Sequence, residues 1–374
     1  MNELFFAKNR NGKWMDAKII EVRPLPGYNE RDVHDTKSYR YYVHFEGKNR
    51  RLDQWVTVDS IREWQKHEQQ LDVDGPVIEH DEHQGLDERQ IAKHEEVTKV
   101  RRIEFLEIGK HRCQTWYFTP LPEHLQDIET LYSCEFCLNF YRCKEELLRH
   151  NKRCTLRHPP GNEIYRDENM SIFEVDGARN PTYCENLCFI AKLFLDHKTL
   201  AFDVTPFLFY VLTENNESGC RYTGYFSKEK KSDQGYNLAC ILVMPYSQGT
   251  GYGKFLISFS YELSRIEKRM GTPERPLSDL GFKAYFKWWA GTIIEVLLKY
   301  AGKTLSINEL SQISYIKEDD IQMTLEKLNL LRYSGGNWSF YANEKYLAQV
   351  RKTLGQPGRP LYPEKLHWTP YRGS

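Results

Sequence analysis

The chain has 374 residues, with 52 lysines and arginines balanced by 52 aspartates and glutamates. This length predicts two or three domains. A net charge of zero excludes a global positive field, so any nucleic-acid contact has to come from local patches. No apolar run approaches about 20 residues, and the N-terminus lacks a signal-peptide pattern, so we expect a soluble intracellular protein with no membrane contact. Nine cysteines, an odd number, argue against a disulfide framework and leave metal binding or thiol chemistry open.

Residues 1–64 predict a small, twisted β unit, with β-rich stretches at 17–22, 39–45 and 55–58. Within 39–45 the odd-numbered residues, including Val43 and Phe45, share one face, and Tyr42 and His44 share the other. The aromatic side chains can fill the core of this unit or form a cage for methylated lysine. A small basic cluster can contact a phosphate backbone (Lys48, Arg50 and Arg51).

Residues 65–96 are polar and lack apolar periodicity, which predicts a linker, partly disordered. Apolar residues return from position 97. We expect strands around 103–108 and at 115–118, where Thr, Trp, Tyr and Phe follow one another.

A metal motif follows in the pattern C-x2-C-x12-H-x3-C, formed by Cys134, Cys137, His150 and Cys154. The first pair predicts a hairpin knuckle, and the second pair predicts two ligands on one helical face. Four soft protein ligands satisfy tetrahedral Zn²⁺ and leave no open position, so the predicted zinc is structural.

Between residues 160 and 265, predicted strands and helices alternate. We expect strands at 171–175, 207–213 and 221–226 and a helix at 184–195, which together indicate an α/β domain. Three further cysteines are most simply read as small buried hydrophobes (Cys184, Cys188 and Cys220).

The central element is an apolar run at 238–244, a glycine-rich turn and a predicted helix at 255–263. A strand, a glycine turn and a helix N-terminus converge backbone N–H groups on one point, as in phosphate sites. A purely structural turn explains this pattern about as well. Phe255 stands where a P-loop needs Ser or Thr. A dinucleotide site would use Glu267, which follows the long helix instead of ending a second strand.

After residue 281 we expect helices at 288–300, 307–313 and 319–328, and then a hairpin at 331–341 around Gly335 and Gly336. Three helices and a hairpin predict a winged-helix-like unit. Few basic residues lie on its third helix, which favours a scaffold role over DNA binding. The proline-rich tail after Gly355 is expected to wrap the surface.

Longer segments add a resemblance. NLACIL, GYGKFLISFSYELS and GTPERPLSDLG surround a Q-x-x-G-x-G turn, and PPGNEIYR, FEVDG, YCENLC, FLDHKTL, PFLFYVLTE and GYFSKEK precede it. Together they resemble the MYST family of histone acetyltransferases over about residues 98–350. The segment YYVHFEGKNRRLDQWVTVDSI resembles the chromo-barrel (Tudor-knot) domain that often precedes that catalytic domain.

The resemblance implies a small β barrel followed by an acetyltransferase (GNAT-like) α/β core with a mixed sheet, a C2HC zinc finger and a winged-helix-like unit. The expected boundaries are 1–64 for the barrel, 65–96 for the linker and 97–374 for the catalytic domain. Within the last, the zinc finger covers 132–157, the acetyl-CoA core 160–281 and the winged-helix-like unit 282–350.

The resemblance also implies acetyl transfer from acetyl-CoA to lysines of histone tails, in the nucleus and within a multisubunit chromatin complex acting on nucleosomes. Glu274 stands at the general base, Cys240 at the active-site cysteine and Lys198 at a lysine that is autoacetylated. The implied acetyl-CoA contacts are Ile241, Leu242, Val243, Gln248, Gly249, Thr250, Gly251, Tyr252, Gly253, Lys254 and Ser278.

Lysine acetylation needs a base that removes a proton from the amine, and burial can tune a carboxylate for this task. Cys240 either accepts the acetyl group or only lines its pocket. We favour direct attack by lysine, because a buried cysteine at the end of a strand, with no predicted base or cation beside it, is poorly activated.

Two departures from the family pattern bear on the cofactor. Gly249 and Thr250 replace two basic residues of the family's loop, and each lost charge-assisted contact would cost about 1.5–3 kcal/mol. Lys287, where the family often has serine, would restore some charge. The alternative is therefore a chromatin adaptor that keeps the fold but binds acetyl-CoA poorly. A dinucleotide oxidoreductase is a distant third.

Overall fold

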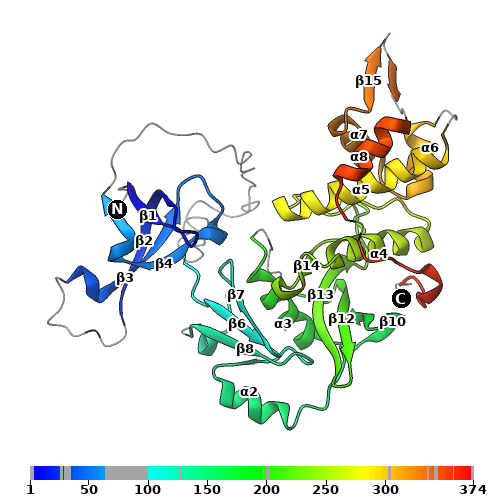
Figure 1. Cartoon of the computed structure of the whole chain (residues 1–374). Coiled ribbons are helices and arrows are strands. Elements are labelled where there is room, and N and C mark those ends of the chain that lie inside the picture. Colours follow the sequence, from blue (N-terminus) through cyan, green and yellow to red (C-terminus); the bar gives the residue numbers. More distant parts are fainter. Residues whose placement is uncertain are drawn as a thin grey trace. The chain divides into compact units, whose positions relative to one another are not determined.

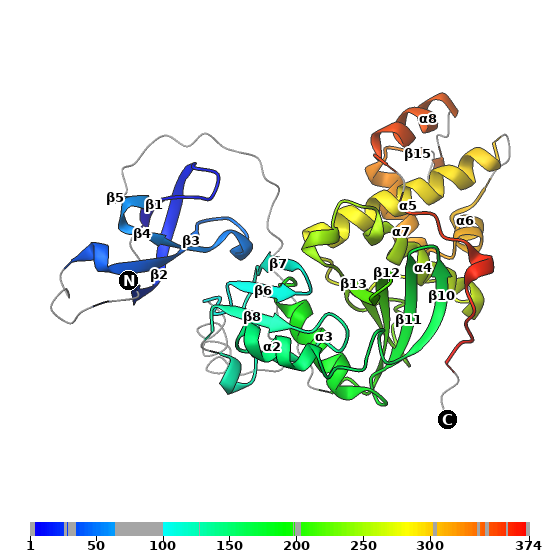
Figure 2. The same ribbon diagram turned by 60° about the horizontal axis from the view of Figure 1, so that its bottom comes forward.

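The computed structural model describes residues 4–25, 28, 35–63, 100–126, 128–196, 198, 203–301, 305–334, 337–340, 344–356 and 358–371. The predicted linker and the Gly335-Gly336 turn lie outside these ranges. The chain forms two compact units (Figures 1 and 2). The first comprises Met1–Leu106, Gln114–Leu131 and Lys192–Thr199, and the second Glu107–Cys113, Tyr132–Ala191 and Leu200–Ser374. No helix in the described ranges has the length and apolar character to span a bilayer.

The first unit contains a five-stranded antiparallel sheet in the order β4-β3-β2-β1-β5. Its strands are β1 (Leu4–Lys8), β2 (Trp14–Pro24), β3 (Tyr39–Phe45), β4 (Gln54–Thr57) and β5 (Ile61–Glu63). Val43 and Phe45 join Ala7, Ala17 and Val56 in one core, which confirms the predicted alternation in β3. Strands β1 and β5 were not predicted from the sequence.

A four-stranded sheet follows, in the order β7-β6-β8-β9. Its strands are β6 (Phe105–Ile108), β7 (His111–Gln114), β8 (Thr130–Ser133) and β9 (Phe140–Tyr141). The strand predicted at 115–118 was wrong. The Thr115 hydroxyl donates to the Ile103 carbonyl, and the Trp116 and Tyr117 amides both donate to the Leu193 carbonyl. These contacts take the backbone out of strand pairing.

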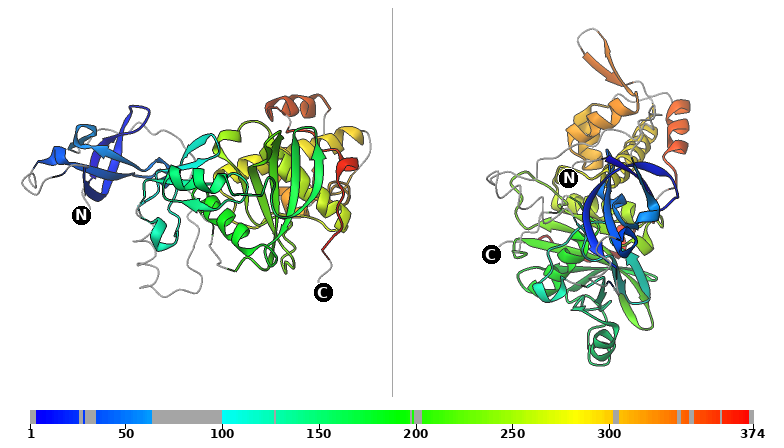
Figure 3. Two further views of the ribbon diagram at one scale, coloured as in Figure 1. Left: turned by 90° about the horizontal axis from the view of Figure 1, so that it is seen from below. Right: turned by 90° about the vertical axis from the view of Figure 1, so that its left-hand side faces the viewer.

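The second unit is built on a sheet in the order β10-β11-β12-β13-β14, with antiparallel neighbours throughout (Figure 3). The strands are β10 (Asn162–Asp167), β11 (Met170–Asp176), β12 (Phe207–Asn216), β13 (Gly219–Glu229) and β14 (Ile241–Val243). Isolated bridges of Leu238 with Pro273 and of Gly271 with Ile316 run parallel. Both strand directions are therefore present, as expected for a mixed-sheet core.

Helix α4 (Tyr252–Glu267) covers one face of this sheet. Its Phe259 packs against Tyr210 and Phe226, whose rings stack with centroids 4.6 Å apart. Helix α3 (Pro181–Lys192) buries Cys184 and Cys188, which confirms the prediction for these two cysteines. Cys220 is only half-buried. Aromatic packing thus holds α4 against the sheet.

The C-terminal part contains three helices and a hairpin, as predicted, and one helix that was not. The helices are α5 (Asp279–Lys299), α6 (Ile307–Ser314), α7 (Glu318–Lys327) and the additional α8 (Glu344–Thr353), and the hairpin pairs β15 (Leu331–Ser334) with β16 (Asn337–Phe340). Helix α7 opens with three acidic residues, which agrees with a scaffold role. The tail then runs along β10, where Leu366 bridges Tyr165.

Candidate functional site

The four predicted metal ligands meet at one point. Cys134 and Cys137 lie in the turn between β8 and β9, and His150 lies on α2 (Lys144–Asn151). With Cys154, their ligand atoms all fall within 4.8 Å of one another. The distance is 3.2 Å from the Cys137 Sγ to the His150 Nε2 and 4.0 Å between the Cys134 and Cys154 Sγ atoms. Three soft thiolates and an imidazole at this spacing fit tetrahedral Zn²⁺ with no open position.

One detail of the metal prediction was wrong, because Cys154 lies beyond the last residue of α2. Its amide still donates to the His150 carbonyl, at 2.8 Å, so the turn after the helix brings the thiol back to the site. Next to the ligands, Glu135 accepts from Arg221 of β13 at 3.1 Å. This ion pair ties the metal knuckle to the sheet of the second unit and supports a structural role for the metal.

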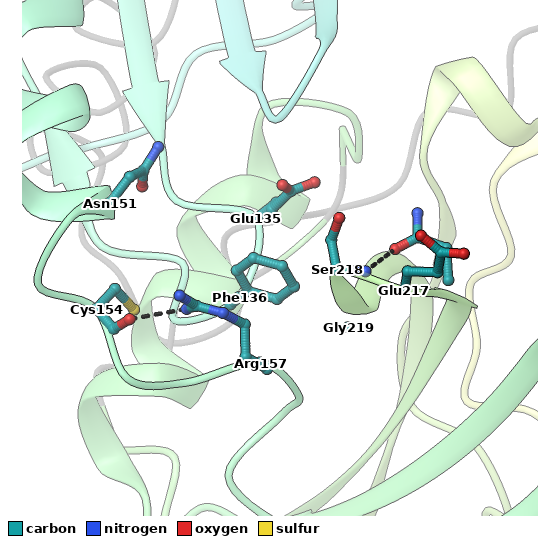
Figure 4. Close-up of a pocket in the computed structure, with 9 residues that line it drawn as sticks. Glu135, Phe136, Asn151, Cys154, Arg157, Glu217, Ser218 and Gly219 are labelled. Carbon is teal, nitrogen blue, oxygen red and sulfur yellow. Dashed lines mark hydrogen bonds between the residues drawn. The ribbon is translucent and has the colours of Figure 1, made fainter.

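A pocket of about 490 Å³ lies beside the metal ligands (Figure 4). Arg157 points across it and donates to the Cys154 carbonyl. None of the residues expected to bind acetyl-CoA or to catalyse lines this pocket. The lining residues are Glu135, Phe136, Asn151, Cys154, Arg157, Asn216, Glu217, Ser218 and Gly219.

The predicted phosphate loop joins β14 to α4. Gly249 and Gly251 adopt positive φ angles of 78° and 91°, which side chains with a Cβ disfavour. Gly251 is the N-cap of α4, and no side chain caps the helix there. Within the part of the chain that the structure describes, the amides of residues 249–254 have no hydrogen-bond acceptor. A cradle of bare amides at a helix N-terminus fits a pyrophosphate.

Two loop side chains brace the turn instead of facing a ligand. The Gln248 amide donates to the Val243 carbonyl at 2.9 Å, and the Thr250 hydroxyl donates to the Ser247 carbonyl at 2.6 Å. Space around Gly249 and Gly253 is open, since a Cβ there would meet no atom within 4 Å. The loop therefore offers backbone donors with room in front of them.

Two lysines lie at or near the loop. Lys254, in the first turn of α4, donates to the Gln356 carbonyl at 2.6 Å. Burial lowers the pKa of Lys254, and the positive charge of Lys287 on α5 lowers it further. Lys287 therefore lies close to Lys254 at the start of α4.

Glu274 lies on a segment held between two other parts of the second unit. On one side its amide donates to the Leu238 carbonyl at 2.8 Å, and the Asn237 amide donates to the Thr272 carbonyl at 3.0 Å. On the other side Gly271 exchanges backbone hydrogen bonds with the α6–α7 junction. The Glu274 side chain is exposed, so the burial expected of a base has to come from a bound substrate.

Asp320 of α7 completes this arrangement, and the sequence did not predict its role. It is 2% exposed, and it accepts from Thr272 at 2.7 Å and from the Arg275 guanidinium. Burial raises the pKa of the Asp320 carboxyl, although Thr272 and Arg275 oppose the shift. The two donors flank Glu274 in the chain. No local signal links residue 320 to residues 272 and 275.

Cys240 precedes β14 and is half-buried, so its expected burial at the end of a strand was wrong. The Leu238 carbonyl that binds the Glu274 amide lies two residues before it. The Ser227 amide donates to the Cys240 carbonyl at 2.9 Å. In return, the Cys240 amide donates to the Ser227 hydroxyl at 3.2 Å. Cys240 and Glu274 therefore stand on adjacent backbone segments at the same edge of the sheet.

The remaining predicted residues fall in three places. Ile241, Leu242 and Val243 form β14, the edge strand of the sheet. Ser278 is the N-cap of α5 and accepts from the Gly281 amide at 3.1 Å, so it has a structural role of its own. Lys198 is half-buried and belongs to the first unit.

On the barrel, Trp55 is already covered by basic side chains. The guanidinium carbons of Arg23 and Arg40 lie 5.2 and 4.7 Å from its ring centre, and the Tyr42 ring lies 5.2 Å away. Cation–π attraction holds the two arginines there. Both guanidinium groups therefore lie against the Trp55 ring.

Comparison with known proteins gives three matching domain profiles. The MOZ/SAS family matches residues 158–365, more than half of the chain, and the MYST family zinc finger domain matches residues 100–154. Residues 2–63 match a domain described as the RNA binding activity-knot of a chromodomain.

Whole-chain relatives agree with these matches. Histone acetyltransferases of the MYST family 2 and 1 from Arabidopsis thaliana are 46% and 45% identical to the chain, and each alignment covers 97% of the chain and 84% of the relative. Histone acetyltransferase ESA1 from Eremothecium gossypii is 40% identical, covering 88% of the chain and 86% of the relative.

Proposed function

The chain belongs to the MYST family of histone acetyltransferases, and on that premise we propose that Glu274 is its general base and that acetyl passes directly to lysine. The substrate amine loses its proton to the Glu274 carboxylate and attacks the acetyl carbonyl, and the CoA thiolate leaves. The observation that carries this proposal is the backbone pairing of Glu274 with Leu238, beside the segment that leads through Cys240 into β14.

Acetyl-CoA fits the loop at the other end of β14. We propose that the bare amides of residues 249–254 receive the pyrophosphate and that the edge strand Ile241–Val243 guides the pantetheine and acetyl groups. Ser278, already a helix cap, would contact the cofactor only through its remaining hydrogen-bonding capacity. Because Glu274 is exposed, the histone backbone has to cover it and exclude water before proton transfer.

Cys240 is assigned to the wall of the acetyl pocket. Its half-buried position leaves it reachable, and its backbone amide donates to the Ser227 hydroxyl at 3.2 Å. An acyl-accepting thiol needs a base or a cation that stabilises its thiolate. Direct attack avoids that requirement.

The competing function is that of a chromatin adaptor with weak cofactor binding. Gly249 and Thr250 favour it, because neither offers charge to a phosphate. Lys287, whose charge reaches Lys254, and the intact amide cradle favour the enzyme. Calorimetric titration with acetyl-CoA, together with acetyl transfer to histone peptides, separates the two. Binding without transfer or a failure to bind would favour the adaptor.

For the domains we propose a barrel at 1–64, a linker at 65–96 and a catalytic domain at 97–374. Zinc in the 132–157 finger is structural. Lys198 is proposed as a site of autoacetylation, and mass spectrometry of the purified enzyme before and after incubation with acetyl-CoA tests this.

We further propose a nuclear location and a place in a multisubunit chromatin complex on nucleosomes. For the barrel, the arginine cover of Trp55 supports nucleic acid over methylated lysine as the ligand. The full chain should retard RNA in an electrophoretic shift assay, and the R23Q/R40Q variant, changed within residues 1–64, should not. This result would support the assignment.

A further inference from the structure

The C-terminal tail returns to the phosphate loop. After α8 the chain passes beside the N-terminus of α4, more than 100 residues away in sequence. The Gln356 carbonyl accepts from Lys254 at 2.6 Å, and the Arg359 Nε donates to the Thr250 carbonyl at 3.3 Å. The two contacts lie on either side of Gly358, so the tail is held at the loop at two points.

Two close approaches define where the tail sits. A Cβ on Gly358 would lie 2.6 Å from the Lys254 Cβ, and a Cβ on Gly251 would lie 3.0 Å from the Arg359 amide nitrogen. Glycine at both positions allows the tail backbone to pass directly over the loop. This proximity therefore comes from close packing of backbone and does not depend on long side chains alone.

The Arg359 guanidinium lies over the Tyr252 ring, with its carbon 4.1 Å from the ring centre. The ring is itself fixed, because the Tyr252 hydroxyl donates to Glu214 at 2.6 Å. Only the Nε of Arg359 has a hydrogen-bond acceptor among the residues that the structure describes. The side chain is exposed, so its other N–H donors are open to a ligand at the loop.

We propose that Arg359 supplies, from the tail, the positive charge that binds the pyrophosphate of acetyl-CoA at this loop. The proposal rests on the proposed function. Gly249 and Thr250 carry no charge, and Lys254 is already engaged by the Gln356 carbonyl. A guanidinium presents several N–H donors in a planar fork that suits phosphate oxygens. The tail thus provides in cis what the loop sequence lacks.

The alternative is that Arg359 only fastens the tail and keeps the loop in shape. If Arg359 only braces the loop, its removal should impair every acetyl donor that uses the loop and β14. If its charge binds phosphate, its removal should impair only a donor that carries phosphate. S-Acetylpantetheine has the reacting thioester without the pyrophosphate, so it distinguishes the two roles.

The test uses the full chain with R359Q, R359K and the matched control R351Q. Arg351 is also an exposed C-terminal arginine, but it pairs with Glu295 on α5 at 2.9 Å, away from the described loop contacts. We expect R359Q to weaken calorimetric binding of CoA by about tenfold, as for one lost charge-assisted contact. R359K should lose less, and R351Q should bind like the wild type. The rate with S-acetylpantetheine should not change in R359Q.

The possible outcomes distinguish a failure of this inference from a failure of the proposed function. Unchanged CoA affinity in folded R359Q overturns the inference alone. An equal loss with CoA and S-acetylpantetheine assigns bracing and also overturns the charge role. A wild-type chain that binds no acetyl-CoA overturns the proposed function together with the inference.

Discussion

The segment that carries Glu274 and the loop that carries the cofactor amides are built in opposite ways. The first is bonded on both sides, to Leu238 and to the α6–α7 junction, and is anchored by the buried carboxylate of Asp320. The second has glycines with positive φ and open space in front of the turn. Its backbone amides have no hydrogen-bond acceptor among the described residues. A base must hold one position relative to the attacked carbon, whereas an anion cradle must keep its donors bare until the ligand arrives.

This difference predicts where substitutions act. Changes around the Glu274 segment should reduce turnover, and changes in the loop should alter cofactor affinity with little effect on turnover at saturation. A variant of either region with the opposite kinetic signature would break the comparison.

The largest effect is expected for Glu274→Gln. The amide keeps size and hydrogen bonding but cannot take the lysine proton, so kcat should fall by roughly 10²–10⁴. Raising the pH should recover part of the loss, because more substrate amine is then neutral. Rates from pH 6 to 9 measure this, with Glu364→Gln, another exposed glutamate, as the control. Full activity in Glu274→Gln would remove the base assignment.

The next largest effect is expected for loss of the metal. Cys137→Ser should remove a zinc ligand and destabilise the second unit by about 4 kcal/mol or more, as metal loss often does, while leaving the catalytic groups chemically unchanged. Purified wild-type protein should carry one zinc by elemental analysis, and thermal unfolding should compare the variant with Cys143→Ser. A well-folded wild type without zinc would contradict a structural metal here.

The metal ligands and the strand–turn–helix form of the glycine loop could both be predicted from the sequence, because each is encoded in spacing over about 20 residues or fewer. Glu274 needed the family resemblance. Asp320 and Arg359 could not be predicted, because their partners lie 45 and 109 residues away in the chain. The failed strand at 115–118 has the same cause, since distant carbonyls capture amides that local propensity assigned to a sheet.

A smaller effect is expected for Asp320→Asn. The amide can still accept from Thr272 but no longer balances Arg275, so the Glu274 segment should loosen and kcat should fall on the order of tenfold. Stability at neutral pH should change by only about 1 kcal/mol, because the Arg275 guanidinium is partly exposed and water can solvate it once its partner is neutral. A loss of affinity at constant kcat would place Asp320 in cofactor binding instead.

The pH dependence of that variant provides a second check. Because burial raises the pKa of the Asp320 carboxyl, the folded chain holds this proton more tightly than the unfolded chain. The resulting stabilisation is complete below the ordinary carboxyl range and is lost as the pH rises through the raised value. Denaturant titrations should therefore show the wild type losing stability relative to Asp320→Asn as the pH rises from the ordinary carboxyl pKa through the raised pKa of Asp320.

For the loop, Gly249→Arg should tighten acetyl-CoA binding severalfold. The new guanidinium enters open space beside the amides, but the positive φ costs about 1–2 kcal/mol of folding stability for a residue with a Cβ. Gly249→Gln carries the same backbone strain without the charge and is the matched control. Calorimetry that shows equal or weaker affinity in folded Gly249→Arg would disprove our account of the loop's missing charge.

The smallest effect is expected for Cys240→Ala. If lysine attacks the acetyl group directly, the thiol only lines the pocket, and its removal takes one sulfur atom from a half-buried position. The rate should stay within about threefold, and stability should fall by about 1 kcal/mol, the central value for point substitutions. Cys240→Ser, which keeps a polar group of similar size, should match it.

Steady-state rates from pH 6 to 9 and mass spectrometry of the wild type mixed with acetyl-CoA alone decide between the routes. An inactive but folded Cys240→Ala, together with an acetyl thioester trapped on Cys240, would establish the covalent route. Glu274 would then activate the thiol and the amine in turn.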